Sequence, residues 1–248
     1  TKSTVKNEWN RYTNKFLGGE ILQKFEKEFA KFHNCKYGIS VNSGTSALFV
    51  AQLAAGVKNN TKVSIPSITF TATTSQVIAT GGIPNFVDID PNSYCMDFNF
   101  KNKTKYAIPV HLLGHPCDFD MIKQMKDNGM FVIEDCAQAM GAKFKNKSVG
   151  SIGDCGIFSF QETKHITTLG EGGIIVTNNE EFAKKCQNIR NHGEYYKDDT
   201  TVGFNLRLTD AQAAFGLAQL KRLPNILKTF RKNAKYIMKN LPEIISPP

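Results

Sequence analysis

Several features are scarce or absent in this sequence of 248 residues, and each absence narrows the class of protein. No apolar run approaches the roughly 18 residues that cross a bilayer, and the N-terminus, Thr1–Thr4, lacks the apolar core of a signal peptide. The six cysteines are scattered and form no Cys-x-x-Cys pair, which argues against a zinc site and a disulfide framework. We therefore expect a cytoplasmic protein with no membrane partner and no metal.

Acidic residues are also few: 22 against 31 basic ones, for a formal net charge of +9. A nucleic-acid-binding protein would concentrate this excess on one face rich in arginine and aromatic residues. Here lysines alternate with polar residues in two short runs, 101–105 and 143–147, which predict solvated turns or hairpin edges. We expect no nucleic-acid partner, and the alternative is that part of the charge attracts an anionic substrate to a cleft.

What the chain does contain is an alternation of strand and helix patterns, without repeats or low-complexity tracts. Short apolar or β-branched runs predict strands at Lys62–Ile65, Asn85–Ile89, Tyr106–Val110, Met130–Glu134, Gly156–Phe160 and Gly173–Thr177. Periodic apolar residues predict helices at Glu20–His33, Thr45–Ala55, Met121–Asp127, Glu180–Arg190 and Asp210–Leu223. The alternation indicates a three-layer α/β/α fold whose mainly parallel, mixed sheet is buried on both faces.

The end of the sequence predicts two consecutive helices and then a linker. Pro224 is expected to end the helix at Asp210–Leu223 and to open another that runs to about Asn240. The tail 241–248 contains three prolines and cannot continue a helix. We therefore expect the chain to be a piece of a longer protein.

Lys164 lies just beyond one predicted strand and just before the glycine-rich run Gly170–Gly173. A lysine held by turns in such a place is a candidate for covalent attachment of an aldehyde cofactor, although most lysines are solvated surface residues. Ligands of parallel sheets bind beyond the carboxyl ends of the strands, where Lys164 and Asp135 would both emerge. The residues expected near Lys164 decide whether it is a cofactor-binding lysine or a solvated surface lysine.

Two other segments are expected to lie near Lys164. Ser43, Gly44 and Thr45 precede a helix, so its free N–H groups and positive dipole end would face an anion, although the same residues also make an ordinary N-cap. Asp135 ends a buried strand, where a cationic ring nitrogen would offset the cost of burying a carboxylate; the alternative is a turn cap. Lysine, acid and phosphate cradle are the protein parts that pyridoxal phosphate requires.

Three more residues are candidates for the same site. Gln138, three residues after Asp135, could reach the phenolic oxygen of the cofactor ring. Phe70 could stack on that ring, although most phenylalanines belong to the core. Asn205 is a polar residue among apolar ones and would ordinarily belong to a turn or cap.

Together these segments make the chain resemble the sugar aminotransferases of the DegT/DnrJ/EryC1/StrS family, which have the aspartate-aminotransferase-like fold of type I. The resemblance extends from about Phe16 to about Asn240. It rests on ordered motifs at 42–45, 69–73, 86–90, 109–112, 134–138, 158–160, 164, 170–173, 190–193 and 203–205.

The resemblance implies how the cofactor is held at its ring. Lys164 would form the Schiff base with pyridoxal 5'-phosphate, and would act as the general base while the cofactor passes through pyridoxamine 5'-phosphate. Asp135 would pair with the ring nitrogen, Gln138 would contact the ring oxygen, and Phe70 would stack on the ring.

The resemblance also implies how the phosphate is held. Ser159 would bind it together with the segment 43–45, and Asn205 would reach the phosphate of the neighbouring subunit in a homodimer with shared active sites. His111 and His192 lie in family motifs, but the resemblance gives them no role.

The implied reaction transfers an amino group, from glutamate, to the keto group of a sugar linked to a nucleotide diphosphate, as in amino-sugar and polysaccharide biosynthesis. Residues 1–240 would form the cofactor-binding large domain, with a helical segment at about 1–35. Residues 241–248 would lead towards a small C-terminal domain that lies outside this chain. In one departure from the commonest family pattern, five residues instead of four separate Lys164 from Gly170.

Two alternatives stay open. The dehydratase branch of the family removes a sugar hydroxyl with pyridoxamine phosphate and has histidine in place of the lysine, so Lys164 argues against it. A catalytically silent homologue that serves as a binding or regulatory subunit would not need the intact set of Lys164, Asp135 and Ser159.

Overall fold

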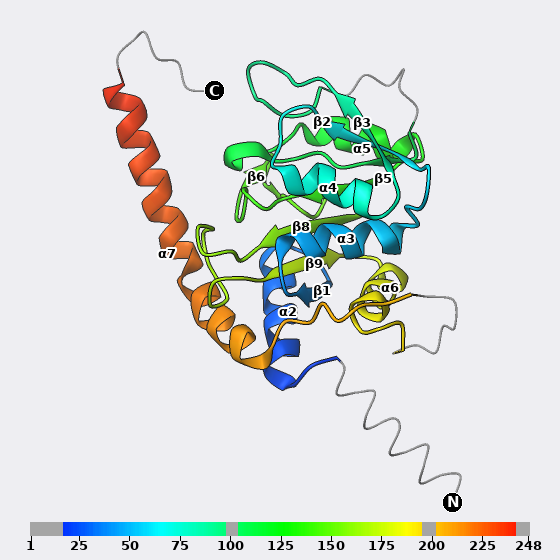
Figure 1. The fold of residues 1–248 in the computed structure, drawn as a ribbon. Helices are drawn as coiled ribbons and strands as arrows, with labels where there is room; N and C mark the ends of the chain where they lie inside the picture. Colours follow the sequence, from blue (N-terminus) through cyan, green and yellow to red (C-terminus); the bar gives the residue numbers. More distant parts are fainter. Residues whose placement is uncertain (1–16, 98–103, 195–201, 242–248) are drawn as a thin grey trace, which may run out of the picture.

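A seven-stranded sheet forms the centre of the protein in the computed structural model, which describes residues 17–97, 104–194 and 202–241 (Figure 1). The strands are β1 (Tyr37–Val41), β2 (Lys62–Pro66), β3 (Ile83–Val87), β4 (Tyr106–Ala107), β5 (Phe131–Asp135), β8 (Cys155–Ser159) and β9 (Gly173–Thr177), in the order β1-β9-β8-β5-β4-β2-β3. Neighbours from β8 to β3 are parallel, whereas β9 is antiparallel to both β8 and β1. The predicted mainly parallel, mixed sheet is confirmed.

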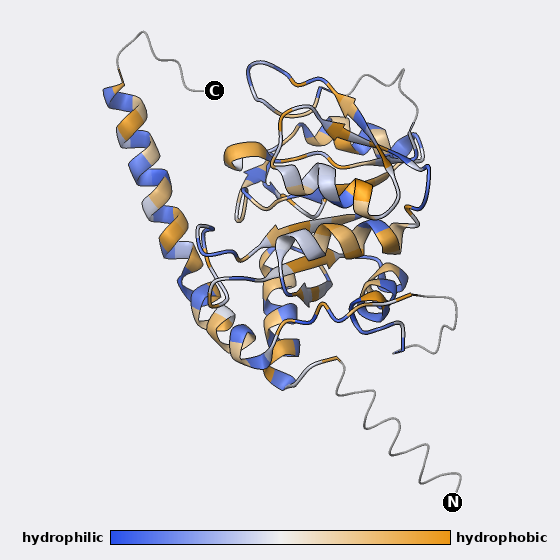
Figure 2. Ribbon diagram, viewed as in Figure 1, coloured by the Kyte–Doolittle hydropathy of each residue, from blue (hydrophilic) through white to orange (hydrophobic). Residues whose placement is uncertain are grey.

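Helices cover both faces of this sheet, which confirms the three-layer arrangement. On one face lie α2 (Glu20–Phe32), α5 (Phe119–Asp127) and the first half of α7 (Asp210–Asn240). On the other lie α3 (Gly44–Ala55), α4 (Thr71–Ala79) and α6 (Glu180–Arg190). Each layer has its own apolar core, and every residue of β8 and β9 is buried. Strands that are covered on both faces have continuous apolar sequences. The hydrophobic residues of these strands are orange in Figure 2.

Smaller elements complete the described structure. The lysine run at 143–147 forms the two-stranded hairpin of β6 (Lys143–Phe144) and β7 (Lys147–Ser148), so the prediction of a hairpin edge is confirmed. The run at 101–105 lies mostly outside the described residues, as do most of the segment 1–19 and the tail 242–248. Within the described residues, no helix combines the length and the apolar character that crossing a membrane requires.

The prediction that Pro224 separates two helices is wrong, because α7 is one helix of 31 residues with Pro224 inside it. A proline inside a helix removes one backbone hydrogen bond, but packing can outweigh that loss. Leu220 and Leu223 before the proline and Leu227 after it lie on the same buried face and contact the core. Beyond them, the C-terminal half of α7 extends away from the body of the molecule (Figure 1).

Three described elements were not predicted: the short 3-10 helix η1 (Leu112–Gly114), α4 and β1. α4 has the sequence TATTSQVIA, which is rich in threonine, and β-branched residues have weak helix propensity. β1 is only five residues long and begins with Tyr37-Gly38, which resembles a turn. It becomes a strand because all five residues pair with β9.

His33, just after α2, is an ionisable group packed inside the apolar layer. Its Nδ1 donates to the carbonyl oxygen of Val149 at 3.3 Å, and its ring stacks on Phe29 with a centroid distance of 5.0 Å. Nε2 has no hydrogen-bond partner. Burial therefore lowers the pKa of His33 to about 3, opposed only in part by the Val149 hydrogen bond and by Glu134.

We predict that His33 makes folding stability fall as the solution is acidified below pH 6.5. The unfolded chain takes up a proton near pH 6.5, whereas the folded chain does so only near pH 3, so this group costs up to about 1.4 kcal/mol per pH unit between those values. The measurement is the free energy of unfolding by urea at several pH values. Replacing the ring in His33→Phe should flatten the dependence on pH, whatever it does to the absolute stability. Equal slopes for the two proteins would contradict the prediction.

Candidate active site

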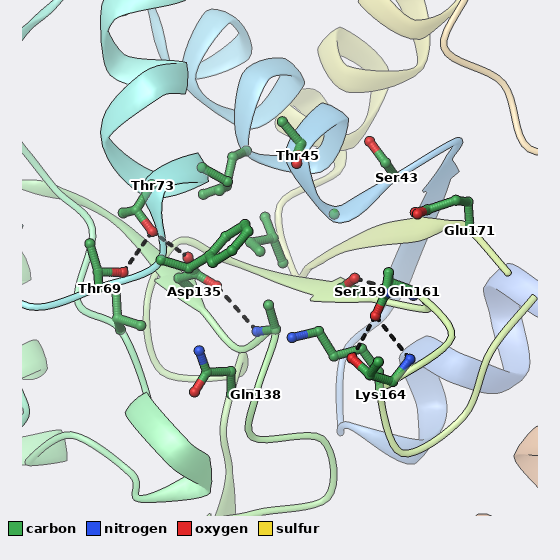
Figure 3. A pocket seen from close by; sticks show the side chains of 18 residues that line it. Ser43, Thr45, Thr69, Thr73, Asp135, Gln138, Ser159, Gln161, Lys164 and Glu171 are labelled. Carbon is green, nitrogen blue, oxygen red and sulfur yellow. Dashed lines mark hydrogen bonds between the residues drawn. The ribbon is translucent and has the colours of Figure 1, made fainter.

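A pocket of about 430 Å³ opens beyond the carboxyl ends of β5 and β8, beside the N-terminus of α3 (Figure 3). All but one of the residues predicted for the site line it; they are Ser43, Gly44, Thr45, Phe70, Asp135, Gln138, Ser159 and Lys164. The exception is Asn205. Residues far apart in the sequence meet here because parallel strands present their carboxyl ends at one edge of the sheet.

Asp135, the last residue of β5, forms the acidic wall of the pocket and is only 5% exposed. Oδ1 accepts the backbone N–H of Ala137 at 3.2 Å, and Oδ2 accepts the hydroxyl of Thr73 at 3.0 Å. Burial raises the pKa of this carboxyl, and the two hydrogen bonds together with His111 and Lys164 oppose the rise. The bond to Ala137 means that Asp135 does cap the next turn, but a capping role alone does not explain why it faces a pocket.

The N-terminus of α3 and the end of β8 meet at a tight junction. Ser43 caps the helix, since its Oγ accepts the backbone N–H of Ser46 at 3.0 Å. The N–H groups of Gly44 and Thr45 belong to the first turn and have no partner within the helix. A side chain on Gly44 would place its Cβ 2.8 Å from that of Ser159, so only glycine fits. The N-cap and the anion-binding interpretations of this segment are therefore compatible.

Gln138 has its amide orientation fixed from outside the pocket. The backbone N–H of Leu113 donates to its Oε1 at 2.8 Å, so the amide nitrogen is the end that faces the pocket, as Figure 3 shows. Leu113 makes this bond from a left-handed backbone conformation, with φ of 53°. No sequence pattern pointed to Leu113, because it acts through its backbone.

Lys164 follows a short turn at the end of β8 and is half-buried. Its backbone N–H donates to the carbonyl of Gln161 at 2.9 Å, and the Gln161 side chain accepts from both the N–H and the hydroxyl of Thr163, at 2.9 and 2.6 Å. Figure 3 shows the lysine side chain pointing across the pocket towards Asp135. Lysine and acid thus face the same space from two neighbouring strands.

His111 belongs to a structural cluster beside the site. Its Nδ1 accepts the backbone N–H of Cys117 at 2.9 Å, so the proton lies on Nε2, which donates to Glu134 at 2.9 Å. Glu134 also accepts the N–H groups of residues 150, 152 and 153. Although burial opposes it, these hydrogen bonds hold the pKa of Glu134 below its usual value. Metal-ligand atoms of His111, Glu134 and Cys136 lie within 4.8 Å of one another, but those of the first two are already engaged in hydrogen bonds.

Three predicted residues lie towards the surface. Phe70 lines the pocket and is 67% exposed, so it is not a core phenylalanine. Asn205 is exposed, pairs through its backbone with Asn191 and does not line this pocket. His192 is exposed in a left-handed turn, where φ is 63° and its N–H donates to the carbonyl of Phe204.

The three-layer fold with its mainly parallel, mixed sheet is the fold of pyridoxal-phosphate-dependent aminotransferases. Residues 5–246 match the model of the DegT/DnrJ/EryC1/StrS aminotransferase family, and the chain belongs to that family.

Relatives of known structure or name agree with this assignment. The chain is 39% identical over 238 residues to GDP-perosamine synthase of Escherichia coli O157:H7, covering 92% of this chain and 65% of that protein. It is 38% identical to an aminotransferase from Psychrobacter cryohalolentis, with a TM-score of 0.78 over 84% of this chain and 57% of that one. The structure of a GDP-4-keto-6-deoxymannose-3-dehydratase with a trapped PLP–glutamate geminal diamine matches with a TM-score of 0.82. The two chains are 31% identical, and the match covers 90% of this chain and 67% of that one. The chain thus spans about two thirds of its relatives' length or less.

The pocket fits pyridoxal 5'-phosphate, the cofactor of this family. The free N–H groups at the N-terminus of α3 suit its phosphate, and Gly44 lets this terminus lie directly against Ser159. The buried Asp135 suits a cationic ring nitrogen, and the amide nitrogen of Gln138 is a donor suited to a ring oxygen.

We predict that Asp135→Asn slows transamination by the full-length protein roughly a hundredfold, because an amide cannot hold the ring nitrogen protonated. It should cost about 1–2 kcal/mol of stability, since one of the two hydrogen bonds must reverse its direction. The measurements are the transamination rate and the thermal midpoint, side by side. A near-normal rate with a lowered midpoint would show that Asp135 is a turn cap and not the cofactor's acid.

Proposed function

We propose that the full-length protein is an aminotransferase that transfers an amino group from glutamate to the keto group of a sugar linked to a nucleotide diphosphate. The single observation that carries the proposal is that Lys164 and Asp135 face one pocket from neighbouring strands, beside a helix N-terminus. Membership of the family and the relatives named above support the substrate class.

Each residue of the pocket then has a task. Bound pyridoxal phosphate supplies an electron sink and a carrier for the amino group. Lys164 would hold the cofactor covalently, and its amine, once released, would serve as the general base that moves a proton. Asp135 keeps the ring nitrogen protonated, Gln138 donates to the ring oxygen, and Phe70 covers the ring. Ser159, whose Oγ already accepts the N–H of Gln161 at 3.3 Å, has its hydroxyl proton free for the phosphate.

The two alternatives are less well supported. A dehydratase of this family would have histidine where Lys164 lies. A silent homologue has no need of a lysine that points at a buried acid.

We also propose that the protein is a homodimer in which Asn205 completes the partner's site. The proposal is supported by the exposure of Asn205, which is not among the residues that line the pocket of its own chain. Val202 and Phe204 beside it are exposed apolar residues at a shallow hollow that Phe49 also lines. We expect a reducing, cytoplasmic setting, because all six cysteines are buried and unpaired.

We predict that the purified full-length protein absorbs visible light through cofactor bound to Lys164. Reduction with borohydride should fix the cofactor on the peptide that contains Lys164, as read by mass spectrometry. Lys164→Ala should still bind the cofactor but leave nothing fixed, whereas Lys143→Ala, at an exposed lysine of the hairpin, should behave as the unsubstituted protein. Cofactor fixed on any other lysine would overturn the assignment.

We predict that active sites are shared between subunits. Asn205→Ala and Lys164→Ala proteins should each be nearly inactive, but mixed dimers should regain activity, because one of the two sites then carries neither substitution. The experiment is to unfold and refold the two proteins together and to compare the rate with those of the parents treated alike. Mixed dimers that never exceed the parents would show that each chain completes its own site.

A further inference from the structure

Three side chains form a continuous line of hydrogen bonds that ends on the acid of the pocket. Thr69 lies 2.9 Å from Thr73, oxygen to oxygen, and the Thr73 hydroxyl lies 3.0 Å from Oδ2 of Asp135 (Figure 3). Thr73 is 1% exposed and lies in the first turn of α4, whereas Thr69 is in the loop that precedes the helix. In the motif at 69–73, Thr73 contacts Asp135 directly and Thr69 contacts Thr73.

The direction of these hydrogen bonds follows from the number of hydrogens. An ionised carboxylate only accepts, so Thr73 must donate its one hydroxyl hydrogen to Asp135. Thr73 can then only accept from Thr69, which is therefore the donor. Both hydroxyl dipoles point their positive ends towards the carboxylate, and each hydrogen bond strengthens the other.

The line of threonines also fixes how the carboxylate is turned. Oδ1 is held by the N–H of Ala137, and Oδ2 by Thr73. A carboxylate oxygen can accept more than one hydrogen bond, so each keeps capacity for a further donor. With both oxygens held, Asp135 presents a fixed edge to the pocket and has no other orientation to adopt.

We propose that Thr73 is a positioning residue of the active site, which orients Asp135 towards the ring nitrogen of the cofactor, and that Thr69 positions Thr73. The inference rests on the proposed function, because it assumes that Asp135 pairs with that nitrogen. It goes further in assigning a role to two hydroxyls that contact neither the lysine nor the helix N-terminus that holds the phosphate.

The hydroxyl of Thr73 also bears on ionisation. Burial raises the pKa of Asp135, and the hydrogen bonds from Ala137 and Thr73 oppose that rise. The other charged or titratable groups around Asp135 are His111 and Lys164, with Glu134 and Cys136 as its neighbours in the chain. Removing the Thr73 hydroxyl leaves these groups unchanged, so the pKa of Asp135 should rise.

The test compares four substitutions in the full-length protein. Thr73→Val keeps the shape of the side chain and removes the hydroxyl, while Thr73→Ser keeps the hydroxyl. Thr69→Val removes only the outer hydrogen bond. Thr71→Val removes an exposed hydroxyl from the same helix and is the matched control. For each we would measure the dissociation constant of pyridoxal phosphate, the dependence of the transamination rate on pH, and the thermal midpoint without cofactor.

We expect Thr73→Val to bind pyridoxal phosphate about tenfold more weakly, as the loss of a hydrogen bond to a charged group implies. Its rate should fall off at a higher pH on the acid side, because Asp135 becomes easier to protonate. Thr73→Ser should restore both the affinity and the pH dependence of the rate. Thr69→Val should weaken the binding of pyridoxal phosphate about threefold and shift the pH dependence in the same direction.

Two outcomes would overturn the proposal. If Thr73→Val matches Thr71→Val in affinity and pH dependence, or lowers only the thermal midpoint, the hydroxyl is merely structural. If Thr73→Val does not fold, Thr69→Val is compared with the control instead. Equal affinities and equal pH profiles of these two proteins would overturn the proposal in the same way. Failure of the unsubstituted protein to bind pyridoxal phosphate would instead refute the proposed function, so the two failures are distinguishable.

Discussion

Two adjacent buried carboxylates at the end of β5 are the constraint on which the site depends. Successive residues of a strand point to opposite faces of the sheet, so Glu134 and Asp135 must be satisfied by different layers. Glu134 is saturated by His111 and by three backbone N–H groups of the loop before β8. Asp135 receives two hydrogen bonds from the described part of the chain and faces a pocket. The first carboxylate therefore fixes the end of the strand, and the second remains available to a ligand.

The hydrogen bonds of Glu134 join several segments around the pocket. His111 contacts Glu134 through its ring, while its backbone N–H donates to the carbonyl of Asp135 at 3.0 Å. This pairs the segment after β4 with the last residue of β5. The following turn brings Leu113 to Gln138, so the buried hydrogen bond between His111 and Glu134 helps to set both the strand end and the amide that faces the pocket.

The sequence predicted the parts of the fold that periodicity encodes, and missed those that depend on tertiary contacts. Lys164, Asp135 and Gly44 could be predicted because each departs from its surroundings: a charge or a glycine beside an apolar element. Thr73 and Leu113 could not, because one is an ordinary residue of a weak helix and the other uses only its backbone. The prediction of a helix end at Pro224 was wrong, because the packing of α7 outweighs the lost hydrogen bond.

The loop after Lys164 is closed by contacts between its two sides. Its two sides are tied by backbone hydrogen bonds from Phe160 to Gly172 and from Glu162 to Gly170, at 2.8 and 2.9 Å. Leu169 and Gly170 both have positive φ, 60° and 104°, so the chain reverses there. A glycine is also required at 173, because a side chain there would collide with the backbone of residues 43 and 44. The glycine run thus closes the lysine loop and lets β9 approach the N-terminus of α3, which ties the position of the lysine to that of the phosphate cradle.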